Sequence, residues 1–219
     1  MATRSEPARQ LDEVLAELRP TLKQHGFRVR ARAFNRTTSD GLTQVVQFQL
    51  GSFQPPGTQE VPGLRANLYG LFTVNLGVYV PEVARSGAGE AGSFVPEYCC
   101  CIRTRLGYVG PENEDVWWEA RADQSLVADL GERLDRDGFP FLERFATRDA
   151  IVAELSSVER QGIGSTPSRI TCAIILAKRG RHAEARDLLR AQADETLNPH
   201  HAEYVRQLAE RLGVGSLGS

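Results

Sequence analysis

The stretch LYGLFTVNLGVYV, residues 68–80, decides the class of fold that this chain can adopt. Its apolar and polar side chains alternate with a period of two, which is typical of a β-strand with one face in a protein core. The apolar positions are Leu68, Phe72, Val74, Leu76, Val78 and Val80. This stretch gives the strongest strand prediction in the chain.

Segments on both sides repeat the alternation. We expect further strands at residues 27–34, 42–50 and 98–106, and a short fifth strand at residues 116–118. Prolines and glycines at residues 51–62, and a Gly/Ala-rich composition at residues 81–93, predict loops. Because the connections are too short for crossover helices, the strands should form an antiparallel meander.

Helical periodicity flanks the predicted sheet. Apolar residues at steps of three and four predict a helix over residues 7–25, in which Pro20 should cause a kink or a break. Asp123 is a typical cap for a helix that Gly138 closes, and Thr147 caps a further helix. Helices that follow an antiparallel sheet usually cover its apolar face. We therefore expect an α+β fold: an N-terminal helix, an antiparallel meander sheet of four to five strands with helices on one face, and a C-terminal helical hairpin.

The C-terminal part is predicted to be a helical appendage. Residues 161–166 have the composition of a linker, and the pattern beyond them resembles one tetratricopeptide-type hairpin with Gly180 at its turn. A single hairpin cannot bury its own apolar face, so it should dock on the rest of the chain or on another chain. We expect an α+β domain at residues 1–160, the hairpin at residues 161–212 and a disordered tail at residues 213–219.

The charge of the chain argues against some classes of partner. Its 219 residues include 26 basic and 28 acidic side chains, which gives a net charge of −2. This balance provides no general attraction to nucleic acid or to an anionic membrane, although a local basic surface is compatible with it. No apolar run approaches the roughly 18 to 20 residues that span a bilayer. We expect a cytoplasmic protein with no membrane partner.

Residues typical of metal sites and catalytic sites lack the spacing that such sites need. Three of the four cysteines are consecutive, at residues 99–101, and the fourth is Cys172. The sequence contains no CxxC knuckle, nucleophile elbow, phosphate-binding glycine loop, HExxH helix or dinucleotide fingerprint. We expect reduced thiols, no metal and no cofactor. No catalytic residue can be assigned, and the sequence favours a protein that is not an enzyme.

Polar residues of the predicted strands gather on the face opposite the apolar one. Arginine is prominent among them, and a guanidinium can bind a carboxylate or a phosphate through two parallel hydrogen bonds. The two adjacent tryptophans should point to opposite faces, which leaves one indole to stack on a ligand or a partner. The candidate binding residues are Arg28, Arg30, Arg32, Gln47, Tyr69, Asn75, Arg103, Arg105, Trp117 and Trp118.

Several separated motifs of the chain are shared with a known bacterial family. They are RAFNR at residues 32–36, GSF at 51–53 with PP at 55–56, LYG at 68–70, FTVNLGV at 72–78, Arg103 with RLG at 105–107, and WW at 117–118. Over roughly residues 11–134 the chain resembles the domain of unknown function family 4304. The resemblance implies a bacterial protein, but no activity, ligand or catalytic residue, and it does not include the C-terminal hairpin.

Three interpretations of the arginine face remain open. The arginines can be solvated, or paired with acids of the C-terminal hairpin such as Glu184, Asp187 or Glu203. They can form a surface for a protein partner, which predicts a non-catalytic intracellular binding module that docks through this face and its adjacent loops. The alternative is an enzyme or receptor that holds an anionic or phosphate-containing ligand on Arg32, Arg103, Arg105 and Asn75. A nucleic-acid partner is less favoured than a protein.

Overall fold

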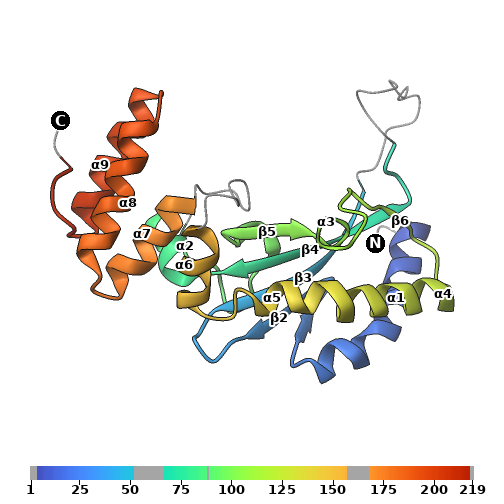
Figure 1. The fold of residues 1–219 in the computed structure, drawn as a ribbon. Helices are drawn as coiled ribbons and strands as arrows, with labels where there is room; N and C mark the ends of the chain where they lie inside the picture. The colour runs from blue at the N-terminus through green and yellow to red at the C-terminus, as the bar shows by residue number, and fades with distance from the viewer. Residues whose placement is uncertain (1–3, 52–66, 88, 157–167, 218–219) are drawn as a thin grey trace. The chain divides into compact units, whose positions relative to one another are not determined.

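An antiparallel sheet is the central element of the fold. The computed structural model describes residues 4–51, 67–87, 89–156 and 168–217. The strands lie in the order β1-β2-β3-β4-β5, and β6 pairs with β4 (Figure 1). Their bounds are β1 (Arg28–Arg30), β2 (Ala33–Thr37), β3 (Thr43–Leu50), β4 (Leu71–Tyr79), β5 (Ile102–Arg105) and β6 (Trp118–Glu119). This order confirms the predicted α+β class and its antiparallel meander.

The prediction of one continuous strand at residues 27–34 is wrong. The chain reverses after Arg30, so that β1 and β2 form a hairpin with Ala31 and Arg32 at its tip. Ala31 has a φ angle of +53°, in the left-handed region that lets a chain reverse within two residues. Because neither glycine nor asparagine marks this turn, the alternation of side chains alone could not reveal it. Arg32 therefore lies in a turn, not on a common strand with Arg28.

Replacement of Ala31 by glycine should stabilise the protein. An L-residue with a side chain pays about 1 kcal/mol in the left-handed region, which glycine populates freely. Because Ala31 is exposed, the change removes little buried surface. We expect the free energy of unfolding, measured by urea denaturation, to rise by about 0.5 to 1 kcal/mol. The control Ala33→Gly, in the extended backbone of β2, should instead lower it, and a loss of stability in Ala31→Gly would contradict the assigned turn.

The chain divides into two compact units, each built from three segments. Unit 1 comprises Met1–Arg36, Val45–Leu76 and Thr104–Leu142, and unit 2 comprises Thr37–Gln44, Gly77–Arg103 and Glu143–Ser219. Strands β2, β3, β4 and β5 contribute residues to both units.

The helices of unit 1 largely follow the sequence prediction. They are α1 (Glu6–Gln24), α3 (Leu106–Val109), α4 (Gln124–Arg133), the π-helical turn η2 (Leu134–Gly138) and α5 (Phe139–Glu143). Helix α1 runs without interruption through Pro20, so the alternative of a broken helix is not found. Asp123 caps α4 as predicted, because its Oδ1 accepts hydrogen bonds from the backbone N–H groups of Ser125 at 2.7 Å and Leu126 at 3.1 Å.

Gly138 does not close the helix that begins at α4, contrary to the prediction. The turn η2 leads from α4 directly into α5. A Cβ atom on Gly138 would lie 3.1 Å from Cδ1 of Leu106 and 3.2 Å from Cδ2 of Leu134. Glycine is therefore placed here by close packing against α3 and not by the end of a helix.

Aromatic rings form the centre of the core of unit 1. Phe34 of β2 and Phe48 of β3 meet edge to face with ring centroids 5.9 Å apart, and Phe48 and Phe72 of β4 are 6.2 Å apart. Trp118 of β6 stacks on Phe72 at 5.9 Å. This row of rings follows the apolar face that the alternation of residues 68–80 predicts.

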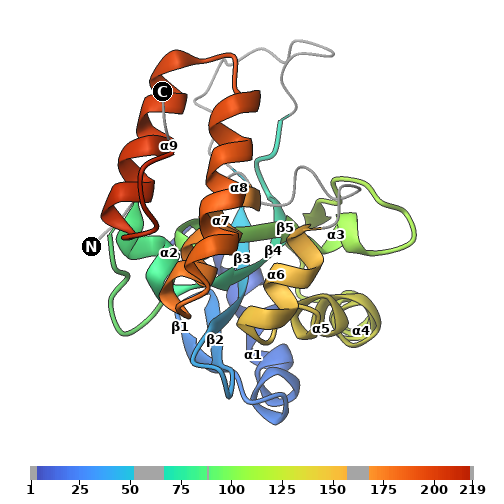
Figure 2. The same ribbon diagram turned by 60° about the vertical axis from the view of Figure 1, so that its left-hand side comes forward.

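Unit 2 contains the other helices of the described residues. They are α2 (Pro81–Ser86), the 3-10 helix η1 (Glu97–Cys99), α6 (Arg148–Ser156), α7 (Ser168–Lys178), α8 (His182–Glu195) and α9 (Pro199–Arg211) (Figure 2). Helix α7 packs against α2, α6 and α8, which buries nearly all of its side chains. Gly180 has a φ angle of +78° at the α7–α8 turn, as expected for its predicted role.

Two predictions in unit 2 need correction. The predicted loop at residues 81–93 begins with α2, because proline at its first position is compatible with a helix start. The predicted strand at residues 98–106 is shortened to β5, because η1 occupies its beginning and α3 its end. Cys101, between η1 and β5, is buried. Most of the predicted loop at residues 51–62 and all of the linker at 161–166 lie outside the described residues.

Candidate functional site

The register of the strands places a row of polar residues across unit 1. Arg28 pairs with Asn35 and Arg30 pairs with Ala33 in the β1–β2 hairpin, so these side chains share a face. The hydrogen bond from Phe48 N–H to the Arg32 carbonyl fixes β3 against β2 with Gln47 beside Ala33. The polar face is defined by Arg28, Arg30, Asn35, Gln47, Gln49, Thr73 and Asn75.

Amide side chains in the middle of the polar face are ordered by mutual hydrogen bonds. The bond from Gly51 N–H to the Leu71 carbonyl aligns β3 with β4. Asn75 Nδ2 then donates to Gln49 Oε1 at 2.8 Å, and Thr73 Oγ1 donates to the Val116 carbonyl at 3.0 Å. Asn75 is 4% exposed, which leaves the exposed Gln49 as the more accessible amide of the two.

Arg32, Arg103 and Arg105 are engaged within the chain. Arg32 Nε donates to Asp12 Oδ1 at 2.9 Å and its Nη2 donates to the Ala8 carbonyl at 3.0 Å. In unit 2, Arg103 holds both carboxylate oxygens of Glu97, at 2.7 and 3.1 Å. Arg105 pairs with Asp115 and its guanidinium lies 5.0 Å from the ring centroid of Trp117.

The acids that hold these arginines are not those of the C-terminal helices. They come from α1, η1 and the segment before β6. Glu184 pairs with Arg181 and Glu203 pairs with Arg206, both in their own part of the chain. Internal pairing therefore occurs, but through neighbours that the strand pattern did not indicate.

Arg28 and Arg30 differ from the other three arginines. Both side chains are exposed, and neither forms an ion pair or a hydrogen bond within the described part of the chain. They lie two residues apart on β1, so both guanidinium groups project from the same side of an edge strand. Of the five predicted arginines, these two are therefore the ones that are exposed and unpaired in the described residues.

The two tryptophans are both half-buried and have different neighbours. Trp117 contacts Arg105, whereas Trp118 packs on Phe72 and donates from its indole Nε1 to Asp129 Oδ2 at 3.3 Å. Because the indole N–H and one ring face of Trp118 both have partners within the chain, internal packing accounts for the presence of a tryptophan at this position. Tyr69 is 46% exposed just before β4.

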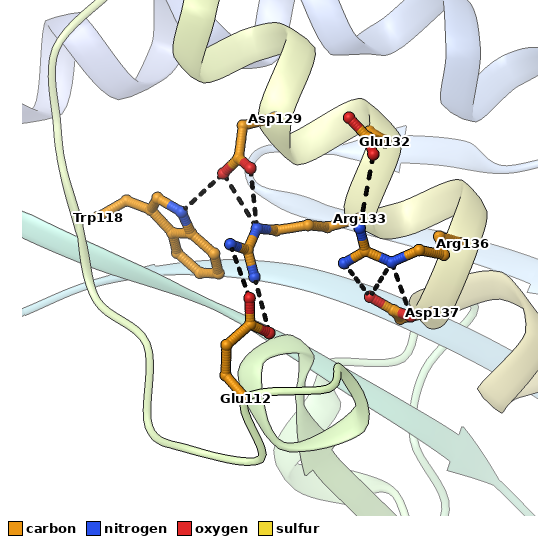
Figure 3. A network of polar contacts seen from close by, with 7 residues as sticks. All are labelled: Glu112, Trp118, Asp129, Glu132, Arg133, Arg136 and Asp137. Carbon is orange, nitrogen blue, oxygen red and sulfur yellow. Dashed lines mark hydrogen bonds and ion pairs between the residues drawn. The ribbon is translucent and has the colours of Figure 1, made fainter.

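Trp118 belongs to a network of ion pairs that the sequence analysis missed (Figure 3). Arg133 Nε donates to Asp129 Oδ1 at 2.9 Å, and its Nη2 lies 3.3 Å from Glu112 Oε1. The hydrogen bonds from Arg133 join α4 to the segment before β6, and they raise the pKa of this guanidinium further. The only sequence signal for this network of ion pairs was the spacing of Asp129 and Arg133, which are four residues apart on a helix.

Burial makes three of the cysteines poor nucleophiles. Burial raises the pKa of Cys101 to about 12 and that of Cys172 to about 11, and it also raises the pKa of Cys100 well above its ordinary value. A thiol in such surroundings stays protonated and unreactive at neutral pH. Within the described ranges, no three His, Cys, Asp or Glu side chains converge as metal ligands.

These observations define a class of protein: an α+β protein whose antiparallel sheet has an aromatic core face and a polar face with two open arginines. The family model described as "Domain of unknown function (DUF4304)" matches residues 63–144. The resemblance seen in the sequence motifs is confirmed for this segment, which includes β4, α2, β5 and α4. Comparison with curated proteins and with solved structures finds no match.

In the described ranges, no helix combines the length and apolar character needed to cross a bilayer.

Proposed function

We propose that this protein is a non-catalytic binding module that docks an acidic segment of a protein partner on the polar face. The supporting observation is the pair Arg28 and Arg30, which are exposed and without an ion pair in the described residues. A guanidinium binds a carboxylate through two parallel hydrogen bonds, so two arginines on one strand select for acidic side chains. The exposed Gln49 adds a donor and an acceptor for the backbone of the bound segment.

The edge position of β1 also supports a peptide partner. In a hairpin with a two-residue turn, the backbone N–H and C=O groups of Arg28 and Arg30 form hydrogen bonds with β2. Because the direction of these groups alternates along a strand, the N–H and C=O of Val29 point away from the sheet. An extended segment can add to such an edge through backbone hydrogen bonds. Short charged edge strands also discourage aggregation, and the experiment below separates that role from docking.

The alternative of an enzyme or receptor for an anionic ligand receives less support. In that hypothesis the ligand is bound by Arg32, Arg103, Arg105 and Asn75. The three arginines already hold Asp12, Glu97 and Asp115. A ligand there would have to displace these carboxylates, whereas an acidic peptide at Arg28 and Arg30 would displace no carboxylate of the described residues.

Charge reversal tests the docking face directly. The variant Arg28→Glu with Arg30→Glu should bind a partner, first captured from the host with the wild-type chain, at least about 30-fold more weakly. The measurement is titration calorimetry with the purified partner. Like charges would then face the acidic segment, while the fold should persist because both side chains are exposed.

A matched control removes the effect of net charge. Arg186 and Arg190 are exposed on α8, and their replacement by glutamate changes the charge by the same amount. This control should bind the partner as the wild type does. Equal affinity of the wild type and the Arg28→Glu, Arg30→Glu variant would refute the proposed face, and an aggregated variant would assign the arginines to protection of the edge.

A further inference from the structure

A groove lies between α1 and α4 in unit 1. Its volume is about 610 Å³, and its lining includes Val14 and Val127 together with the small side chains of Ala16, Ala122 and Ala128. Because alanines line both walls, the two helices leave open space above the buried Val14. The accessible apolar lining of the groove therefore comes from the three alanines and from the half-buried Val127, with Val14 buried beneath them.

The rim of the groove is acidic. Glu13 and Glu17 lie one turn apart on α1, are exposed, and form no ion pair within the described residues. Asp123 lines the α4 side, where its carboxylate caps the helix and lies 3.3 Å from Nη2 of Arg121. An apolar base with two uncompensated carboxylates selects for a segment that presents paired cations beside apolar atoms.

The β1–β2 hairpin presents such a pair. Arg28 and Arg30 are two strand residues apart, which corresponds to about 6.6 Å along the chain. Glu13 and Glu17 are four helical residues apart, which corresponds to about 6 Å along the helix axis. The two arginines of β1 and the two glutamates of α1 therefore have nearly the same spacing.

Within one chain these two pairs do not meet. Arg32, at the tip of the hairpin, is held by Asp12 on α1. The described residues contain no ion pair between β1 and either Glu13 or Glu17. A second copy of the chain can bring them together, because each copy offers both surfaces.

We propose that the groove between α1 and α4 receives the β1–β2 hairpin of a second copy. The two copies are related by a two-fold axis, so the hairpin of each copy lies in the groove of the other. This inference rests on the charge-pairing part of the proposed function, since it names a second copy as the protein whose acids meet Arg28 and Arg30; because those acids lie on helix α1, the contact uses the arginine side chains and not the backbone edge of β1. Two reciprocal contacts close the assembly at a dimer. The guanidinium groups of Arg28 and Arg30 then face Glu13 and Glu17, and the arginine stems cover the alanines.

Charge-swap variants of the full chain test this arrangement. One variant carries Arg28→Glu with Arg30→Glu, and the other carries Glu13→Arg with Glu17→Arg. Each alone places like charges in both contacts, so its dimer dissociation constant should rise at least about 30-fold in sedimentation velocity. Mixing the two variants restores opposite charges in both contacts and should restore the dimer, while Arg186→Glu with Arg190→Glu should leave it unchanged.

A wild-type chain that stays monomeric at high concentration would overturn the inference, and so would a dimer that neither variant weakens. A mixture of the two variants that stays monomeric would also overturn it, provided that both variants show the circular dichroism of the wild type. The proposed function has a separate readout. A monomeric wild type whose captured partner still depends on Arg28 and Arg30 would refute the second copy and support the docking face. Loss of both dependences would refute both proposals.

Discussion

Replacement of Arg148 by alanine is expected to lower the free energy of unfolding by about 3 kcal/mol. In unit 2, Arg148 begins α6 and lies between Glu82 of α2 and Asp40 of the β2–β3 turn. Its Nε and Nη2 donate to the two carboxylate oxygens of Glu82 at 2.5 and 2.9 Å, and its Nη1 donates to the Asp40 carbonyl. Glu82 is 5% exposed, so the alanine variant would leave a buried carboxylate without its counter-charge.

The size of this loss should depend on pH. Burial raises the pKa of Glu82, but the hydrogen bonds and positive charge of Arg148 outweigh it and hold this pKa below its ordinary value. A carboxyl whose pKa is lowered in the folded state stabilises the protein above its unfolded-state pKa, and that contribution is lost as the pH falls through the lowered value. Without Arg148, burial should raise the pKa of Glu82. Urea denaturation should therefore show the largest difference from the wild type at neutral pH and a smaller one in acid.

Two further variants separate the buried pair from surface ion pairs. Arg181 pairs with Glu184 at 2.6 Å on the surface, where water screens the charges, so Arg181→Ala should destabilise the protein far less than Arg148→Ala. The double variant Glu82→Gln with Arg148→Met removes both buried charges and should recover much of the lost stability. An Arg148→Ala variant as stable as Arg181→Ala would show that the buried pair makes no special contribution.

The sequence predicted the features of the fold that depend on neighbouring residues. Alternation located β4, and the side chains of Asp123 and Thr147 marked helix starts that the structure confirms. These signals act within a few residues of the chain, so no knowledge of tertiary contacts is needed. The turn at Ala31 escaped because its left-handed backbone is imposed on a residue that carries no local signal for it.

The candidate site was harder to predict because it depends on long-range pairing. Arg28, Arg30 and Arg32 look equivalent in the sequence RVRAR, yet among the described contacts only Arg32 meets an acid, on a helix 20 residues earlier. Arg148 bonds Glu82 across 66 residues, and nothing in its local sequence indicates this contact. Which arginines remain open is thus decided by tertiary structure, whereas their presence on one face follows from strand periodicity.

Replacement of Gly107 by alanine is expected to lower the free energy of unfolding by about 3 kcal/mol. A Cβ atom on Gly107, in α3, would lie 2.4 Å from the Glu114 carbonyl oxygen and 2.6 Å from Cγ2 of Val116. The first of these is a backbone atom, which cannot rotate away as a side chain can. The segment is also fixed at its far end, because the Val116 carbonyl accepts the hydrogen bond from Thr73 Oγ1. Relief of the overlap would therefore pull this segment away from β4.

The same substitution at Gly131 provides the control. Gly131 lies within α4 and a Cβ atom there would meet nothing within 4 Å. Gly131→Ala should raise the free energy of unfolding by about 0.5 to 1 kcal/mol, because alanine loses less backbone entropy in a helix. Urea denaturation of both variants measures the two opposite effects. If Gly107→Ala also stabilised the protein, the close approach of α3 to the segment before β6 would be wrong, and with it the placement of Trp117 beside Arg105.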